Sequence, residues 1–112
     1  MIEQVIYDFI KRNGPVDCYM ERPETAPEEY CLIEKTGSVT ADKLTTSTIA
    51  VQSYAKSLYK AAVINGEIIE LMNTLPYYAD AVAGVRLNSD GNFTNATAKQ
   101  YRYQAVFTVT HY

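Results

Sequence analysis

The sequence predicts a single α+β domain, residues 1–112, in which an antiparallel sheet of about five strands carries two helices on one face. Two segments repeat apolar residues at helical spacing, and others have the alternation or the β-branched composition of strands. The connections between successive strands are short, which favours antiparallel pairing and helices gathered on one side. The predicted order is helix, three strands, helix, two strands.

Two helices are predicted. The first covers residues 1–11 and ends before the Asn-Gly-Pro sequence at 13–15. Its apolar stripe is Ile2, Val5, Ile6, Phe9 and Ile10. The second begins after a cap at Ser53 or Ser57 and closes at Pro76, because the residue before a proline avoids the α region. Its apolar positions are Leu58, Ala61, Ala62, Ile68, Leu71, Met72 and Leu75.

Five segments are predicted to be strands. The first alternates apolar and polar residues around Cys18, and the third is rich in β-branched side chains. The last two are joined by the turn-rich residues 90–97 and are predicted to form a terminal hairpin. The segments are 16–20, 30–36, 43–54, 81–89 and 99–112.

The connections also carry information. Residues 21–29 contain two prolines and four glutamates, so they are expected to form an exposed loop rather than to pair in the sheet. Polar residues 38–42 are expected to lead from the second strand into the third. If the terminal strand, residues 99–112, lies at the edge of the sheet, its unpaired backbone groups would invite pairing with a neighbouring subunit.

Composition and charge limit the possible functions. Apolar residues make up 47% of the chain and charged residues 21%, which is typical of globular proteins and argues against disorder. The net charge is −3 and the pI about 5.0, so specific nucleic-acid binding is not expected. No apolar stretch approaches the roughly 20 residues that cross a bilayer, and the N-terminus lacks a signal peptide's pattern, so we expect an intracellular chain without a membrane partner.

No catalytic, cofactor or metal site is predicted, and the chain is not expected to be an enzyme. The only histidine, His111, lies next to the C-terminus, where chains fray and catalytic geometry is hard to hold. Cys18 and Cys31 have no second cysteine pair nearby and are expected to be small buried thiols in a reducing compartment. The five glycines are isolated from one another, so no phosphate-binding loop is predicted.

The chain contains ten tyrosines and no tryptophan. Tyrosine suits half-buried strand faces and protein interfaces equally well, because it combines apolar area with a hydroxyl. The predicted function is therefore protein binding, with these candidate interface residues: Arg22, Tyr30, Lys35, Arg86, Tyr101, Arg102 and Tyr103. The alternative is that the charged members are solvated strand-face residues and that the tyrosines belong to the core.

Four stretches carry a resemblance to a known family: YMERP at 19–23, YCLIEKTG at 30–37, VQSYA at 51–55 and YRYQAVF at 101–107. They resemble tail-terminator or tail-completion proteins, also called minor tail or minor capsid proteins, of long-tailed bacteriophages of Gram-positive hosts. The resemblance implies a structural virion protein, assembled in the host cytoplasm, that caps the tail tube as a ring, commonly of six subunits. Its implied partners are copies of itself, the tail tube protein and the head connector proteins.

A ring around a DNA path would also gain from an acidic lining, because like charge keeps phosphates from adhering to the wall. On the resemblance, that lining or loop consists of Glu21, Glu24, Glu28 and Glu29. DNA would then pass through the ring without being bound. Two alternatives stay open: a head-side connector adaptor or minor capsid component, and a generic intracellular protein-binding module.

Overall fold

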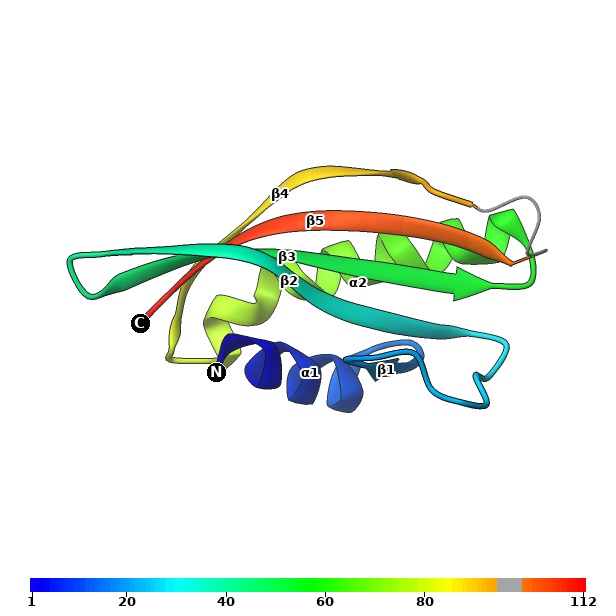
Figure 1. Cartoon of the computed structure of the whole chain (residues 1–112), viewed down its shortest axis with the longest axis horizontal. Coiled ribbons are helices and arrows are strands. Elements are labelled where there is room, and N and C mark those ends of the chain that lie inside the picture. Colours follow the sequence, from blue (N-terminus) through cyan, green and yellow to red (C-terminus); the bar gives the residue numbers. More distant parts are fainter. Residues whose placement is uncertain (95–99) are drawn as a thin grey trace.

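The computed structural model describes residues 1–94 and 100–112. Its elements are α1 (Ile2–Asn13), β1 (Asp17–Tyr19), β2 (Tyr30–Ala41), β3 (Leu44–Ala55), α2 (Leu58–Tyr78), β4 (Val82–Asn92) and β5 (Tyr101–His111), as Figure 1 shows. The predicted α+β class and the predicted order of elements along the chain are confirmed.

The five strands form one sheet in the order β1-β2-β3-β5-β4. All neighbours are antiparallel except β1 and β2, which are parallel. The prediction of a purely antiparallel sheet is therefore wrong at β1. Residues 20–29 are long enough to carry the chain back to the end of the sheet where β1 began, so β2 runs in the same direction.

The terminal strand β5 is not an edge strand, contrary to the arrangement considered from the sequence. It lies between β3 and β4 and pairs with both over most of its length. The reason is the crossover through α2, which delivers β4 to the outer position. The hairpin β4–β5 then brings β5 back alongside β3.

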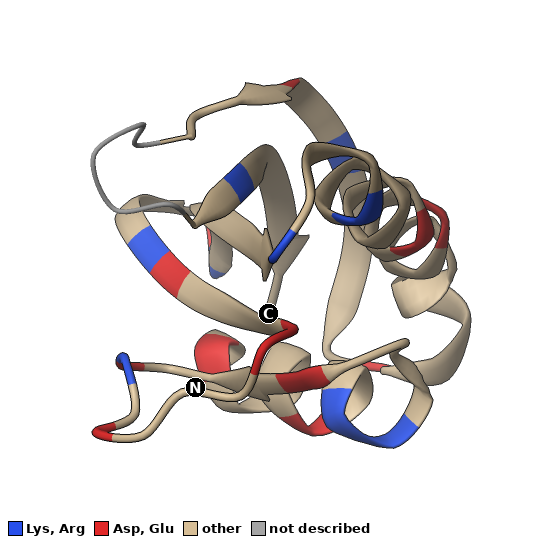
Figure 2. Ribbon diagram, turned by 90° about the vertical axis from the view of Figure 1, so that its right-hand side faces the viewer, with Lys and Arg blue, Asp and Glu red and all other residues tan. Residues whose placement is uncertain are grey.

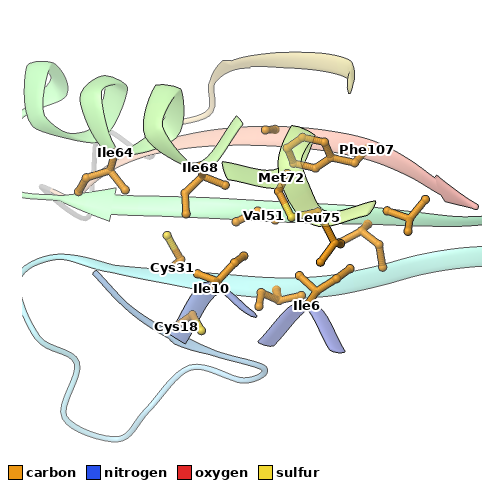
Figure 3. Packing of buried hydrophobic residues seen from close by; sticks show 14 of the residues in the cluster. Ile6, Ile10, Cys18, Cys31, Val51, Ile64, Ile68, Met72, Leu75 and Phe107 are labelled. Carbon is orange, nitrogen blue, oxygen red and sulfur yellow. The ribbon is translucent and has the colours of Figure 1, made fainter. Parts of the chain in front are cut away.

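Both helices pack on the same face of the sheet, as predicted. Alternate residues of the strands point to this face, and they form one buried cluster with the apolar stripes of α1 and α2 (Figure 3). Ile6 and Ile10 come from α1, and Ile68 and Met72 from α2; all four are fully buried. The largest strand contribution is the buried ring of Phe107.

The β2–β3 hairpin is longer than predicted. Residues 38–42, expected as a connection, lie mostly in β2, because Ser38 to Ala41 pair in register with β3. The turn is only Asp42 and Lys43, with φ of 52° and 68°, which is the two-residue turn whose twist suits a hairpin. We call residues 36–48 the arm; Figure 1 shows it projecting past both termini.

Smaller differences from prediction lie at the ends of α2 and β4, and the structure decides between the two predicted caps of α2. The helix α2 continues through Pro76 to Tyr78, because proline in the last turn removes only one backbone bond and the Ala79 N–H still donates to the Leu75 carbonyl at 3.0 Å. Its cap is Ser57, whose hydroxyl accepts from the Lys60 N–H, and not Ser53. Strand β4 extends to Asn92 into the predicted 90–97 turn, of which residues 95–97 lie outside the described residues, as does residue 99.

Candidate subunit interface

The sheet ends in two edges that no described strand covers. At one end, β1 pairs only with Tyr30 to Leu32, so β2 is open along its outer side from Ile33 to Ala41. At the other end, β4 pairs with β5 alone. Because β2, β3, β5 and β4 alternate in direction, the two open edges run antiparallel to each other. Such edges present free N–H and C=O groups to an approaching strand.

The open part of β2 carries protecting features only at its start, where Glu34 and Lys35 are charged and the register with β3 shifts between Lys35 and Gly37. From Thr36 to Ala41 it contains no charged residue and no proline, and all of these residues are exposed. Edge strands that avoid pairing generally carry lysine, proline or an inward-pointing charge. This segment is therefore the most suitable place on the described surface for another strand to add.

Lys35 and Arg86, two of the predicted interface residues, lie on the two open-edge strands. Lys35 on β2 forms an ion pair with Glu3 of α1, with 3.6 Å between Nζ and Oε1. Arg86 on β4 is exposed, and its Nε donates to Asn88 Oδ1 at 3.3 Å. The structure thus brings these two residues to opposite edges of one subunit, where they are separated from each other.

The predicted tyrosines are more buried than an interface role requires. Tyr30 is fully buried, and its ring stacks on Tyr54 with centroids 4.7 Å apart. Burial raises the pKa of the Tyr30 hydroxyl. Tyr101 and Tyr103 are half-buried and pack against the core on the helix-covered face. These three rings therefore pack within the single subunit, as the alternative reading of the tyrosines expected.

Arg22 and Arg102 hold connecting segments in place. Arg102 Nε donates to the Phe93 carbonyl at 3.1 Å, and its Nη1 donates to the Tyr54 hydroxyl at 3.5 Å. Arg22 Nη2 donates to Gln100 Oε1 at 3.2 Å, which joins the 20–29 loop to the residue before β5. Arg22 is exposed and Arg102 is half-buried, so both side chains can still contact a partner.

The acidic loop is only partly available as a negative surface. Glu21, Glu24 and Glu28 are exposed, whereas Glu29 is half-buried. Glu28 Oε1 lies 3.0 Å from Lys56 Nζ, so part of the negative charge is neutralised within the subunit. Figure 2 shows acidic and basic segments interspersed in its view, without one large patch of a single sign.

Sequence reasoning missed one close polar pair. The Ser47 hydroxyl lies 2.8 Å from His111 Nε2, because their strands β3 and β5 are neighbours in the sheet. The resemblance to a nucleophile and its base is limited to this distance: Ser47 is fully buried, and His111 Nδ1 faces the Tyr112 carbonyl at 3.4 Å rather than a carboxylate. The pair joins the end of β5 to β3, so His111 lies in an ordered strand rather than in a frayed terminus.

The described residues contain neither a cluster of metal ligands nor a membrane-spanning helix. No three side chains among the described His, Cys, Asp and Glu lie close enough to share a metal ion. Cys18 and Cys31 are free and buried, and desolvation raises their pKa values to about 11 and about 12. In the part of the chain that the structure describes, no helix has the length and apolar character needed to cross a bilayer.

No protein-family model matches the sequence, and no curated protein matches it at a significant level.

Proposed function

We propose that this chain is a structural virion protein that assembles as a ring on the end of a phage tail tube and joins the tail to the head. Two things support the proposal. The four stretches that resemble tail-terminator proteins fall mainly on strands of the sheet, with YCLIEKTG on β2, VQSYA on β3 and YRYQAVF on β5. The second support is the pair of open edges. This is the main observation in favour of assembly, because the two edges can join one copy to the next.

One subunit has an open β2 edge and an open β4 edge that run in opposite directions. A contact between the β2 edge of one copy and the β4 edge of the next is heterologous and keeps the antiparallel alternation. Every copy uses each edge once, so the contact repeats and gives a ring when the rotation between copies closes, or an open filament when it does not. A closed ring is the form that a cap on a tube needs, because an open filament would not terminate growth.

The test is the solution mass of the wild-type chain by light scattering over a concentration series, followed by electron microscopy of any large species. We expect closed rings. Ser38→Lys places a charge on the open β2 edge and should shift the chain towards monomer, since a charged side chain opposes strand addition there. The matched control is Asn73→Lys, which adds the same charge at an exposed position of α2 and should leave the rings intact.

Two outcomes would contradict the proposal. The first is a wild-type chain that stays monomeric both alone and when mixed with purified tail tubes, which would favour a generic protein-binding module. The second is a ring that binds only head connector proteins in a pull-down that also offers tail tube protein, which would favour a head-side adaptor.

A further inference from the structure

The open edges of β2 and β4 each carry one irregularity, and the two match. On β2, the register with β3 shifts between Lys35 and Gly37. On β4, the register with β5 shifts between Leu87 and Ser89. Each shift marks one extra residue, which moves the side chains after it to the other face of the sheet. A regular strand therefore cannot follow either edge with its faces in step, whereas a strand with its own extra residue at the same level can.

One antiparallel register of β2 against a neighbour's β4 places the two extra residues opposite each other. In it, Lys35 faces Asp90 on one side of the shifts, and Ser38 faces Leu87 on the other side. All four side chains point to the helix-covered face, because their partners on β3 and β5 belong to the alternating buried residues of that face. A displacement by two residues would leave the shifts at different levels and oppose different faces between them.

The lengths of the two edges select the same register. Strand β1 covers β2 as far as Leu32, so a neighbouring strand reaches no further than Ile33. In this register Asn92, the last residue of β4, lies opposite Ile33, and Gly84 lies opposite Ala41, the last residue of β2. The remaining shift of β4 precedes Gly84 and falls beyond the end of β2. The contact therefore uses the whole open length of β2.

The backbone groups of the two edges are also in phase. The Phe93 N–H donates to the Arg102 carbonyl at 2.8 Å, so Arg102 turns its backbone groups towards β4. Because alternate residues of antiparallel strands bond to opposite neighbours, the registers carry this phase across the sheet. The residues that turn their N–H and C=O groups outward are Ile33, Lys35, Ser38 and Thr40 on β2, and Asn92, Asp90, Leu87 and Val85 on β4. Taken in this order, they are the pairs of the register, so each pair can exchange hydrogen bonds.

We infer that residues 33–41 of one copy pair antiparallel with residues 84–92 of the next copy, with Lys35 opposite Asp90. This inference rests on the proposed ring and names its subunit contact. Both residues are exposed in the single subunit. Lys35 lies 3.6 Å from Glu3, and Asp90 accepts from Asn65 Nδ2 at 3.1 Å but forms no ion pair among the described residues. A second copy thus supplies Asp90 with an opposite charge on the neighbouring strand.

On the face opposite the helices, the same register places Val39 opposite Arg86. Val39 is 72% exposed in the single subunit, and the aliphatic stem of an arginine can cover such a side chain. Glu34 lies opposite Gly91, which has no side chain to oppose it. The contact thus continues this face of the sheet from one copy to the next and covers the exposed valine.

Disulfide trapping tests the register, because a disulfide needs Cα atoms about 4.4–6.8 Å apart. Two variants, Val39→Cys with Arg86→Cys and Ala41→Cys with Gly84→Cys, place cysteines directly opposite each other. Under oxidised glutathione each should give a ladder of oligomers on a non-reducing gel. The matched controls exchange the partners, 39 with 84 and 41 with 86, whose Cα atoms become diagonal neighbours about 7–8 Å apart. We expect the controls to give at least about tenfold less cross-linked product.

The background in this experiment is low. A Cβ added at Gly84 has nothing within 4 Å, and the other three positions are exposed, so the variants should fold. The two edges of one subunit are separated by β3 and β5, so no disulfide can join them within a copy. The native thiols Cys18 and Cys31 are fully buried and should not react. A ladder therefore reports contacts between copies.

Charge reversal gives an independent readout. Lys35→Glu and Asp90→Lys should each weaken self-association by about three- to tenfold, because like charges would then lie opposite each other. The double variant restores an opposite pair and should regain most of the loss. Lys60→Glu, at an exposed position of α2, is the control for net charge and should have no such effect. Light scattering measures association, and circular dichroism checks that each variant is folded.

The outcomes separate this inference from the proposed function. A ladder from a control pair in place of the matched pairs shows a displaced register and overturns the inference. Rings that form without a ladder from any of the four variants also overturn it, and leave the ring proposal standing. Ladders from the matched pairs in a chain that forms open oligomers but no closed rings support the contact and count against the proposed ring.

Discussion

Tyr30 and Tyr54 lie face to face on the side of the sheet opposite the helices, with ring planes only 7° from parallel. The two rings differ in their hydroxyls. The Tyr54 hydroxyl donates to Gln52 Oε1 at 2.8 Å and accepts from Arg102 at 3.5 Å, whereas the buried Tyr30 hydroxyl has no hydrogen-bond partner among the described residues. The stack therefore pairs a satisfied phenol with an unsatisfied one.

This difference predicts opposite effects of the same substitution. Tyr30→Phe removes an unsatisfied buried hydroxyl and should raise the free energy of unfolding by about 1 kcal/mol. Tyr54→Phe removes a bonded hydroxyl and should lower it by about 1 kcal/mol. Urea unfolding of the two variants beside wild type measures both. Loss of stability in Tyr30→Phe would show that its hydroxyl is bonded in solution.

The buried thiols predict a loss of stability at alkaline pH. Their pKa values rise from 9.0 to about 11 for Cys18 and about 12 for Cys31 in the folded chain. The folded state holds these two protons more tightly than the unfolded state. The stability that the protonated thiols contribute is therefore fully present below pH 9.0 and is lost as the pH rises towards their folded pKa values. Between pH 9.0 and its folded pKa, each thiol should lower the unfolding free energy by at most about 1.4 kcal/mol per pH unit.

The measurement is urea unfolding at several pH values between about 8 and 10.5. The control is Cys18→Ala, which removes one of the two buried thiols, so its stability should fall less steeply with pH than that of wild type. Equal slopes would contradict the assignment, because tyrosine and lysine titration is common to both chains.

The turn of the arm predicts a stabilising substitution. Lys43 has φ of 68°, a left-handed conformation that costs a side-chain-bearing residue about 1 kcal/mol or more relative to glycine. Lys43→Gly should therefore raise the unfolding free energy by up to about 1 kcal/mol, as measured by urea unfolding. Lys43→Ala removes the same charge but keeps the strain, so it should give no such gain. If Lys43→Ala also raised the unfolding free energy, the gain would come from the loss of charge and not from relief of strain.

The acidic loop predicts a change in DNA handling without a change in assembly. Glu21→Lys with Glu24→Lys reverses two exposed charges that form no ion pair among the described residues. If these residues line the path of DNA, the variant ring should retain DNA at low salt in a gel-shift assay, while the wild-type ring should not. Light scattering should show the same ring mass for both. A variant that no longer assembles would place these glutamates at a subunit interface.

Most of the local structure could be predicted from the sequence, because its signals are short in range. The apolar stripe of Ile2, Ile6 and Ile10 determined α1 and the face that it buries. The alternation of Tyr103, Ala105 and Phe107 likewise determined β5 and the face that it turns to the core. These patterns depend only on the periods of helix and strand. They can therefore be read from each segment without knowing which other segments pack against it.

The tertiary structure alone decided which strands are neighbours, and with that the candidate interface. Nothing local to residues 101–111 indicates that β5 lies inside the sheet, nor does residue 17 or 18 indicate a parallel partner. The order follows from where α2 and the 20–29 loop return the chain, which depends on packing between distant segments. The open edges and the Ser47–His111 pair both result from that packing, because each depends on residues that are far apart in the sequence.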